Sequence, residues 1–248
     1  MNDVLEIPER KKRIFVAENF EPSTWEAIEP YFKNLLEREI NSLEVLHNWL
    51  KDWSEFDAVL GEYSRWVYVR TTIDTSDQKA QAELVNLYAT IYPKMVVQNN
   101  LLDSKFVNNP FIGELDQDVF YTTIRKVKKS LELFREENIP LNSEMQVKQT
   151  TYDQIAGAQS IHYKGAELTV QQAMVYLKSN DRSQREEVFN LIKERKLQDV
   201  ETLDNLFTEL IQLRHKVAVN AGFKNYLEYR FEELGRFDYT PADCLQFH

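Results

Sequence analysis

Cysteine is almost absent from this sequence, which excludes a disulfide-stabilised fold. Cys244 is the only cysteine among 248 residues, so no internal disulfide can form. The opening segment MNDVLEIPERKKR has acidic residues where a secretory signal needs an apolar run. No apolar run approaches the roughly 18 to 20 residues that span a bilayer. We therefore expect a soluble cytoplasmic protein with no membrane partner.

Glycine and proline are also scarce. The chain has six glycines and seven prolines, about half of what average usage gives. Long uninterrupted helices leave little room for turn residues, so this scarcity favours a helical protein. The hydrophobic share of 43% and the aromatic share of 12% supply a buried core.

Basic side chains are outnumbered by acidic ones, 30 to 40. The mean field of such a chain repels phosphate backbones, which excludes nucleic acid as an expected partner. The strongest basic run, Arg10–Arg13, is interpreted as a solvated leader beside Pro8 and Glu9.

Capping residues and apolar spacing predict helices in the first part of the chain. Ser23 and Glu26 have the spacing of a capping box, and Ser42 can cap a second helix. Residues 54–73 fit a strand at Trp66–Val69, but their apolar residues keep a helical period, so we favour a helix. Residues 74–77 predict a break, and Pro93 predicts a kink in the helix that follows.

The middle of the chain predicts two more helices and a hairpin. We expect a helix over 116–137, ended by Asn138-Ile139-Pro140, and a next helix that Ser143 and Gln146 start as a capping box. Gly157 ends this second helix. Residues 159–169, with Lys164-Gly165 at the turn, have the pattern of a β-hairpin. Thr169 and Gln172 then box a short helix through Leu177.

A single long helix is predicted over about 183–221, capped by Ser183 and stopped by Gly222. Unbroken, it would be about 57 Å long. We expect it to bury Leu203, Phe207 and Leu210 against neighbouring helices. A shorter helix follows over 225–234, and Gly235 ends it.

The last eleven residues, DYTPADCLQFH, carry the signals of a helix start. Thr240 can act as the N-cap, Pro241 suits the first helical position, and Asp243 complements the helix dipole. A helix this short cannot hold itself together in water. We therefore expect a continuation after residue 248.

The four histidines and the single cysteine are the first candidates for catalytic chemistry. A helical zinc peptidase site needs two histidines four residues apart with a glutamate after the first, and His47, His162, His215 and His248 do not have this spacing. His162 and His215 are interpreted as ordinary solvated side chains. Cys244 and His248 are four apart, but no third residue to orient them is evident.

Acidic pairs and aromatic residues are likewise given structural interpretations. Glu186-Glu187 and Glu232-Glu233 are interpreted as solvated helix faces, and the four tryptophans as core anchors. No glycine-rich phosphate loop is present. We assign no catalytic and no metal-binding residue, and the substrate-binding residues stay unassigned.

The run from Asn180 to Cys244 resembles the middle of the oligoendopeptidase F family of thimet-like zinc metallopeptidases. The resemblance depends on the motifs NDRSQR before the predicted long helix, GFKNY after it, and RFDYTP ahead of the final segment. The hairpin with Gly165, Glu167 and Leu168 also fits, and a weaker helical pattern extends the likeness over most of the chain.

The resemblance implies an all-α fold with one small β-hairpin, forming the front lobe of a two-lobed protein that encloses a channel for short peptides. It places the zinc and its ligands downstream of this chain, so zinc belongs to the intact protein and not to this segment. We expect residues 1–248 to form a single helical region, with short peptides and the C-terminal half as partners. The alternative is a non-enzymatic helical binding or scaffolding domain.

Overall fold

The computed structural model describes residues 12–247, which form eleven α-helices and one two-stranded antiparallel sheet. Two 3-10 turns, Ile112–Glu114 and Val175–Lys178, and a π-helical turn, Leu87–Ile91, complete the regular structure of this part. The elements are α1 (Trp25–Glu37), α2 (Leu43–Ile73), α3 (Gln78–Asn86), α4 (Tyr92–Val107), α5 (Gln117–Leu133), α6 (Asn138–Gly157), β1 (Ser160–Tyr163), β2 (Ala166–Thr169), α7 (Val170–Met174), α8 (Arg182–Leu197), α9 (Val200–Asn220), α10 (Tyr226–Glu233) and α11 (Pro241–Phe247).

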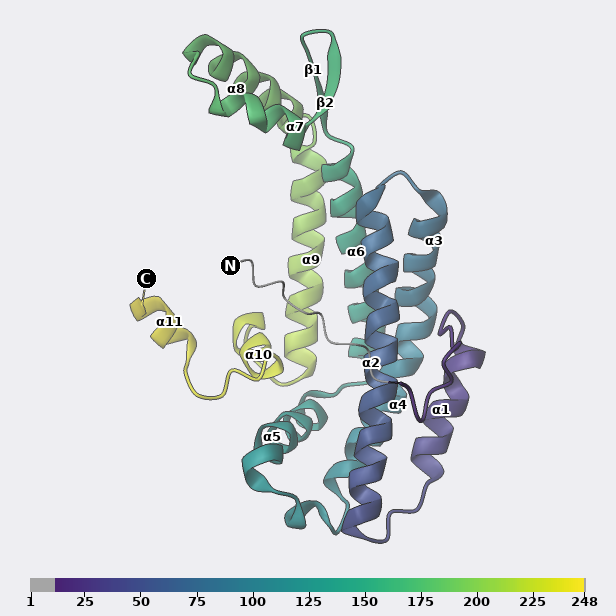
Figure 1. Cartoon of the computed structure of the whole chain (residues 1–248). Helices are drawn as coiled ribbons and strands as arrows, with labels where there is room; N and C mark the ends of the chain where they lie inside the picture. Colours follow the sequence, from purple (N-terminus) through teal and green to yellow (C-terminus); the bar gives the residue numbers. More distant parts are fainter. Residues whose placement is uncertain (1–11, 248) are drawn as a thin grey trace, which may run out of the picture.

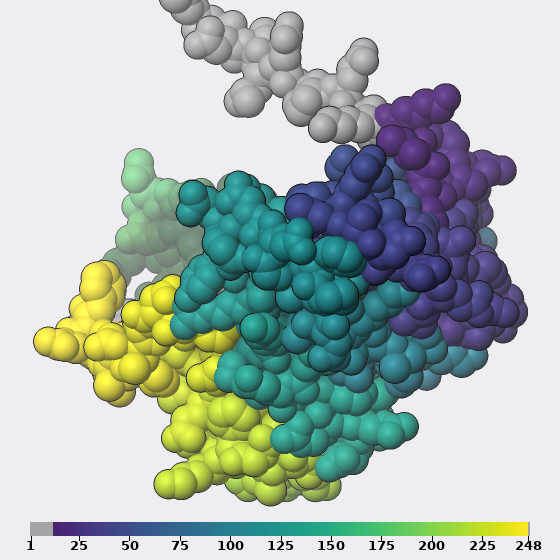
Figure 2. All heavy atoms as spheres, turned by 90° about the horizontal axis from the view of Figure 1, so that it is seen from below, coloured from purple at the N-terminus to yellow at the C-terminus, as the bar shows by residue number. Residues whose placement is uncertain are grey.

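Long helices α9, α6 and α2 stand roughly parallel and form the body of the molecule (Figure 1). The hairpin, α7 and α8 lie at one end of this body, and α5, α10 and α11 lie toward the other. Seen from below, the teal middle of the chain lies between the purple and blue N-terminal segments and the yellow C-terminal one (Figure 2). The predicted class, helical with one small hairpin, is confirmed.

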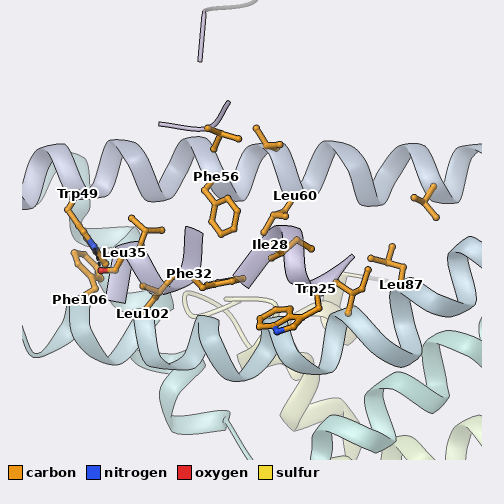
Figure 3. Close-up of a cluster of buried hydrophobic side chains, with 14 of the residues drawn as sticks. Trp25, Ile28, Phe32, Leu35, Trp49, Phe56, Leu60, Leu87, Leu102 and Phe106 are labelled. Atoms are coloured by element: carbon orange, nitrogen blue, oxygen red, sulfur yellow. Dashed lines mark hydrogen bonds between the residues drawn. The ribbon is translucent and has the colours of Figure 1, made fainter. Parts of the chain in front are cut away.

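The largest core cluster joins α1, α2, α4 and the π turn. Its fully buried aromatic side chains are Phe32, Trp49, Phe56 and Phe106. The indole Nε1 of Trp49 donates a hydrogen bond to the carbonyl of Leu35 over 2.9 Å (Figure 3). This bond satisfies the polar atom of the indole, so a fully buried tryptophan leaves no unpaired donor in the core.

The structure confirms the helix favoured over residues 54–73, which continues the helix that starts at Leu43, but corrects two details. Ser42 caps α2 as predicted, accepting from the Val45 N–H over 3.2 Å. The first helix, in contrast, is capped by Thr24, one residue after the predicted Ser23. Trp66 is 54% exposed, so the interpretation of all four tryptophans as core anchors is wrong for this one. The strand propensity of Trp66–Val69 is overridden because apolar residues at helical spacing in α2 are buried in the core.

Where the sequence predicts a kink at Pro93, the structure has a π-helical turn, Leu87–Ile91, immediately before α4. Proline lacks the N–H that would bond to the preceding turn, and a wider π turn removes the regular bond that it would break. The predicted break over residues 74–77 separates α2 from α3, with Asp77 as the N-cap of α3.

The boundary near residue 138 was predicted wrongly. Helix α5 ends at Leu133, and Asn138 and Ile139 begin α6 instead of ending the previous helix. Pro140 lies in the first turn of α6, where its missing N–H has no intrahelical partner to lose. Ser143 therefore lies inside α6 and caps nothing, and its buried hydroxyl makes no hydrogen bond among residues 12–247.

The hairpin over residues 159–169 is confirmed. Strand β1 pairs with β2 so that Ile161 faces Leu168. Lys164 and Gly165 both have positive φ, 50° and 80°, as a two-residue turn of the primed type requires. The capping box of Thr169 and Gln172 at the start of α7 is also present.

The long helix predicted over 183–221 is two helices, α8 and α9, separated at Gln198-Asp199, and α8 is capped by Asp181 instead of Ser183. The Asp199 carboxylate accepts hydrogen bonds from Arg195 over 2.6 Å and from Gln159 over 2.8 Å. These bonds hold the chain at the break, and α8 turns away from α9 (Figure 1). Helix α8 packs on the hairpin and α9 on α6, so the two helices follow different partners.

The ends of the last helices agree with the predictions. At the end of α9, Gly222 has φ 88° and the Phe223 N–H reaches back to the Ala218 carbonyl over 2.9 Å. Gly235, at φ 68°, follows α10. Thr240 and Asp243 exchange hydrogen bonds at the start of α11. The basic run Arg10–Arg13 lies outside the described residues except for Lys12 and Arg13.

Candidate functional site

An open groove of about 590 Å³ lies between α2 and α9, with α6 forming its floor. The groove is lined by side chains from these three helices and from the π turn. They are Tyr68, Tyr88, Gln146, Gln149, Thr150, Tyr152, Asp153, Leu203, Asp204, Leu206, Phe207, Leu210 and Arg214.

Antiparallel packing of α6 against α9 fixes the floor and one wall of the groove. Near one end of the pair, Gln159 bonds to Asp199, and further along, the Lys148 ammonium bonds to Glu209 over 2.6 Å. At the far end, the buried Asn138 amide donates to the Val217 carbonyl over 3.0 Å. Polar contacts at three levels hold the two helices in one register.

Tyrosine hydroxyls give the groove neutral hydrogen-bonding groups. The Tyr68 hydroxyl donates to Asp153 over 3.4 Å, and the nearby carboxylate charge raises the pKa of Tyr68. Burial raises the pKa of Tyr88. Both phenols are therefore protonated at neutral pH and can donate as well as accept.

Apolar side chains occupy the α9 wall of the same groove. Leu210 is buried in the core shared with α6 and α10, as predicted. Phe207, which was predicted to be buried, is 58% exposed, and Leu203 is half-buried. The apolar pattern of α9 is therefore wider than its contact with α6, and its second stripe faces the groove.

A second, smaller pocket of about 330 Å³ lies among α4, α5, α6 and α10. Burial raises the pKa of Asp103 in this pocket to about 6, against a hydrogen bond from Ser130 that lowers it. Lys129 is committed to Glu132 and Glu232, at 2.5 and 3.2 Å. The charged side chains of this pocket are thus largely paired with one another, unlike those of the α2–α6–α9 groove.

The titratable residues weighed from the sequence do not come together. His47, His162 and His215 lie on α2, β1 and α9. The side chains of His162 and His215 are exposed, and Cys244 lies on α11. His248 lies outside the described residues, and so does the Cys244–His248 pair that was weighed from the sequence.

The acidic pairs behave differently from one another. Glu186 and Glu187 are exposed on α8, in keeping with a solvated face. Glu232 pairs with Lys129, and Glu233 pairs with Arg230. Glu232 therefore joins α10 to α5, and Glu233 forms an ion pair within α10. The interpretation of Glu232-Glu233 as a merely solvated face is wrong.

No group of three or more His, Cys, Asp or Glu side chains within residues 12–247 is arranged to hold a metal ion. The residues present in this part do not fit a zinc site, which needs three protein ligands around one open position. Within the same residues, no helix combines the length and low charge content that crossing a membrane requires.

Residues 15–134 match the family model described as the Peptidase M3 N-terminal domain. Over these residues the chain is similar to that peptidase domain. The match covers α1 to α5 and therefore includes the α2 wall of the groove. It confirms the resemblance to the N-terminal portion of the oligoendopeptidase F family.

Solved structures share the fold of this matched part of the chain and of the helices that follow it. A protein described as oligoendopeptidase F has a TM-score of 0.85 at 22% identity, over 93% of this chain and 41% of its own. A protein from Bacillus anthracis str. Ames, also described as oligoendopeptidase F, has a TM-score of 0.85 at 20% identity, over 95% and 44%. PZ peptidase A with an inhibitor has the same score at 20% identity, over 92% and 41%.

The chain thus spans less than half the length of these solved structures. No curated protein matches the sequence. At these identities the likeness establishes the fold, whereas the groove residues come from the structure alone. Sequence reasoning missed the groove because its residues are spread along the chain from Tyr68 to Arg214. The apolar stripe of α9 that is not buried was the signal that could have indicated it.

Proposed function

We propose that this chain is the N-terminal, substrate-binding part of a zinc-dependent oligoendopeptidase, and that the α2–α6–α9 groove binds short peptides. The lining of the groove is the main observation in support of this proposal. An exposed phenylalanine, three tyrosines and two glutamine amides line one open depression. That depression lies in a fold shared with proteins described as oligoendopeptidases.

The chemistry of the lining suits a peptide of varied sequence. Neutral hydroxyl and amide groups, such as those of Tyr88 and Gln149, can bond to backbone N–H and C=O groups, which every peptide carries. Phe207 offers an apolar surface for a side chain. The groove is open to solvent, so a peptide segment can enter it from solution.

Peptide-bond hydrolysis would depend on groups outside this segment. The described residues hold no set of ligands that fits zinc. We place the zinc ligands and the general base in protein sequence downstream of residue 248, in a C-terminal half that would close the channel. The role of this segment is then to bind and orient the peptide, and cytoplasmic location remains a prediction.

Parallel assays test whether peptide cleavage needs the sequence downstream of this segment. A fluorogenic peptide would be incubated with the 248-residue chain and with the complete reading frame, each with and without a chelator, and zinc would be measured in both. We expect chelator-sensitive cleavage and bound zinc only in the complete protein. Cleavage by the short chain, or a complete protein with neither zinc nor activity, would overturn the proposal.

A peptide-binding experiment distinguishes this function from that of a helical scaffold. Unlabelled pentapeptides would be titrated into the isotope-labelled 248-residue chain and followed by NMR. We expect shifts confined to groove residues such as Tyr68, Tyr152 and Phe207. The absence of any shift at millimolar peptide would remove the groove as a peptide site and favour the scaffold.

A further inference from the structure

The groove has an ordered layout of charge along its length. Asp153 on α6 and Asp204 on α9 both line it. The contacts between Gln159 and Asp199 and between Lys148 and Glu209 set the antiparallel register of these two helices. In that register Asp153 and Asp204 stand at the same level, so two carboxylates share one end of the groove.

Neither of these two carboxylates forms an ion pair in the described part of the chain. Asp153 accepts only the long bond from the Tyr68 hydroxyl, at 3.4 Å. The Asp204 carboxylate has neither a hydrogen bond nor an ion pair with any of residues 12–247. Glu209, five residues further along α9, is in contrast paired with Lys148 at 2.6 Å. The helix pair thus satisfies the acid outside the groove and leaves the two acids inside it available.

A single cationic side chain lies further along the same wall. Arg214 follows Asp204 by ten residues, which is about 15 Å along an α-helix. Its guanidinium lies over the ring of Tyr226, 5.9 Å from the centroid, and pairs with no carboxylate of the described residues. Phe207 lies between the two charged levels in sequence and is exposed to the same groove.

We propose that the groove binds a short peptide by both of its free ends. The peptide α-ammonium lies between Asp153 and Asp204, and the α-carboxylate meets Arg214. An extended chain advances about 3.3 Å per residue, so a separation of about 15 Å fits four to five residues. A central apolar side chain then contacts Phe207. This inference rests on the proposed function, because it assigns a substrate class to the same groove.

The test compares peptides that differ only at their ends. The probe is the unlabelled pentapeptide Ala-Ala-Phe-Ala-Ala, titrated by NMR into the 248-residue chain in four forms: free, N-acetylated, C-amidated and doubly blocked. We expect each block to weaken binding by about three- to tenfold, with the loss decreasing as salt is added. Tripeptides and octapeptides with free ends should bind less tightly than the pentapeptide.

Variants assign each end to its partner. Asp204→Asn should weaken the N-terminally free peptides and leave the acetylated ones unaffected, and Arg214→Gln should do the same for C-terminally free peptides. Glu201→Gln, which changes an exposed acid on the same helix but outside the groove, is the matched control. Circular dichroism melting of each variant confirms that the fold is retained.

The outcomes separate this inference from the proposed function. If blocked and free pentapeptides bind equally well, recognition of the ends is wrong while peptide binding stands. An acetylated peptide with lysine as its first residue that recovers the lost affinity would show that the acidic pair reads a side chain, which also overturns the inference. If no form binds, peptide binding by this groove fails with it.

Discussion

Lys105 in α4 caps the C-terminal end of α1, with its ammonium 2.7 Å from the carbonyl oxygen of Leu36. The same ammonium donates to the carbonyls of Leu35 and Arg38. The last carbonyls of a helix have no intrahelical partner, and a cation there both bonds to them and offsets the helix dipole. The capping group comes from 69 residues away, beyond the reach of any local sequence rule.

Replacing this cap should destabilise the protein. We expect Lys105→Met to lower the free energy of unfolding by about 1.5 to 3 kcal/mol, because hydrogen bonds from a charged donor are lost at partly buried carbonyls. Urea denaturation followed by circular dichroism measures the change. The control is Lys33→Met, which removes an exposed pair with Glu37 at 3.8 Å and should cost about 0 to 0.5 kcal/mol. Equal losses in both variants would contradict the capping role.

The two faces of α9 should respond differently to truncation. We expect Phe207→Ala to cost less than about 1 kcal/mol, because the ring is already largely exposed. Leu210→Ala, three residues later on the buried face, should cost about 2 to 5 kcal/mol. Chemical denaturation of both variants tests this, and a loss of several kcal/mol for Phe207→Ala would mean that the ring is covered in solution.

Two glycine substitutions should change the stability of the protein in opposite directions. Gly222 has φ 88°, so Gly222→Ala forces a side chain into the left-handed region and should cost about 1 to 2 kcal/mol. Gly61 lies within α2, and a Cβ there meets nothing within 4 Å. Gly61→Ala should therefore stabilise by about 0.4 to 1 kcal/mol. Melting temperatures of the two variants provide the measurement, and a shift of the same sign in both would be the contrary result.

Asp103 should make stability depend on pH in the weakly acidic range. Its pKa is raised from 3.8 to about 6, chiefly by burial, so the folded state retains a proton that the unfolded state releases between these values. Stability should therefore fall as pH rises through this window, and the loss is complete above about pH 6. Asp103→Asn should abolish this component and stabilise the protein at pH 7 by on the order of 1 to 3 kcal/mol.

The measurement is the free energy of unfolding from pH 4 to pH 7 for both proteins. The charge of Asp57, whose own pKa burial also raises, contributes to the raised pKa of Asp103, so the difference between variant and parent is the quantity to compare. Asp204→Asn controls for the removal of one exposed negative charge. Parallel pH profiles for parent and Asp103→Asn would refute the assignment.

Local chemistry was enough to predict many elements correctly. Ser42, Thr169 and Thr240 cap helices where the sequence placed them, and Gly222 ends a helix as predicted. The turn at Lys164-Gly165 follows from the same short-range rules. Each of these signals acts over only three or four residues, so the chain carries them wherever it folds.

The errors occur where distant partners compete with local signals. Asp199 interrupts the predicted long helix because Gln159, forty residues earlier, bonds to it. Asn138 begins a helix instead of ending one, with its buried amide bonded to the Val217 carbonyl of α9. In both places the local pattern was compatible with a different outcome, and a contact between distant parts of the chain decided it.

The sequence by itself determined the helical class, the hairpin and most helix ends, because periodicity, caps and turns are properties of neighbouring residues. Only the tertiary structure decided which apolar stripes are buried, that Phe207 remains exposed, and that Asp153, Asp204 and Arg214 share one groove. The physical reason is that burial and unpaired charge depend on which helices pack together, and that packing joins residues far apart in the chain.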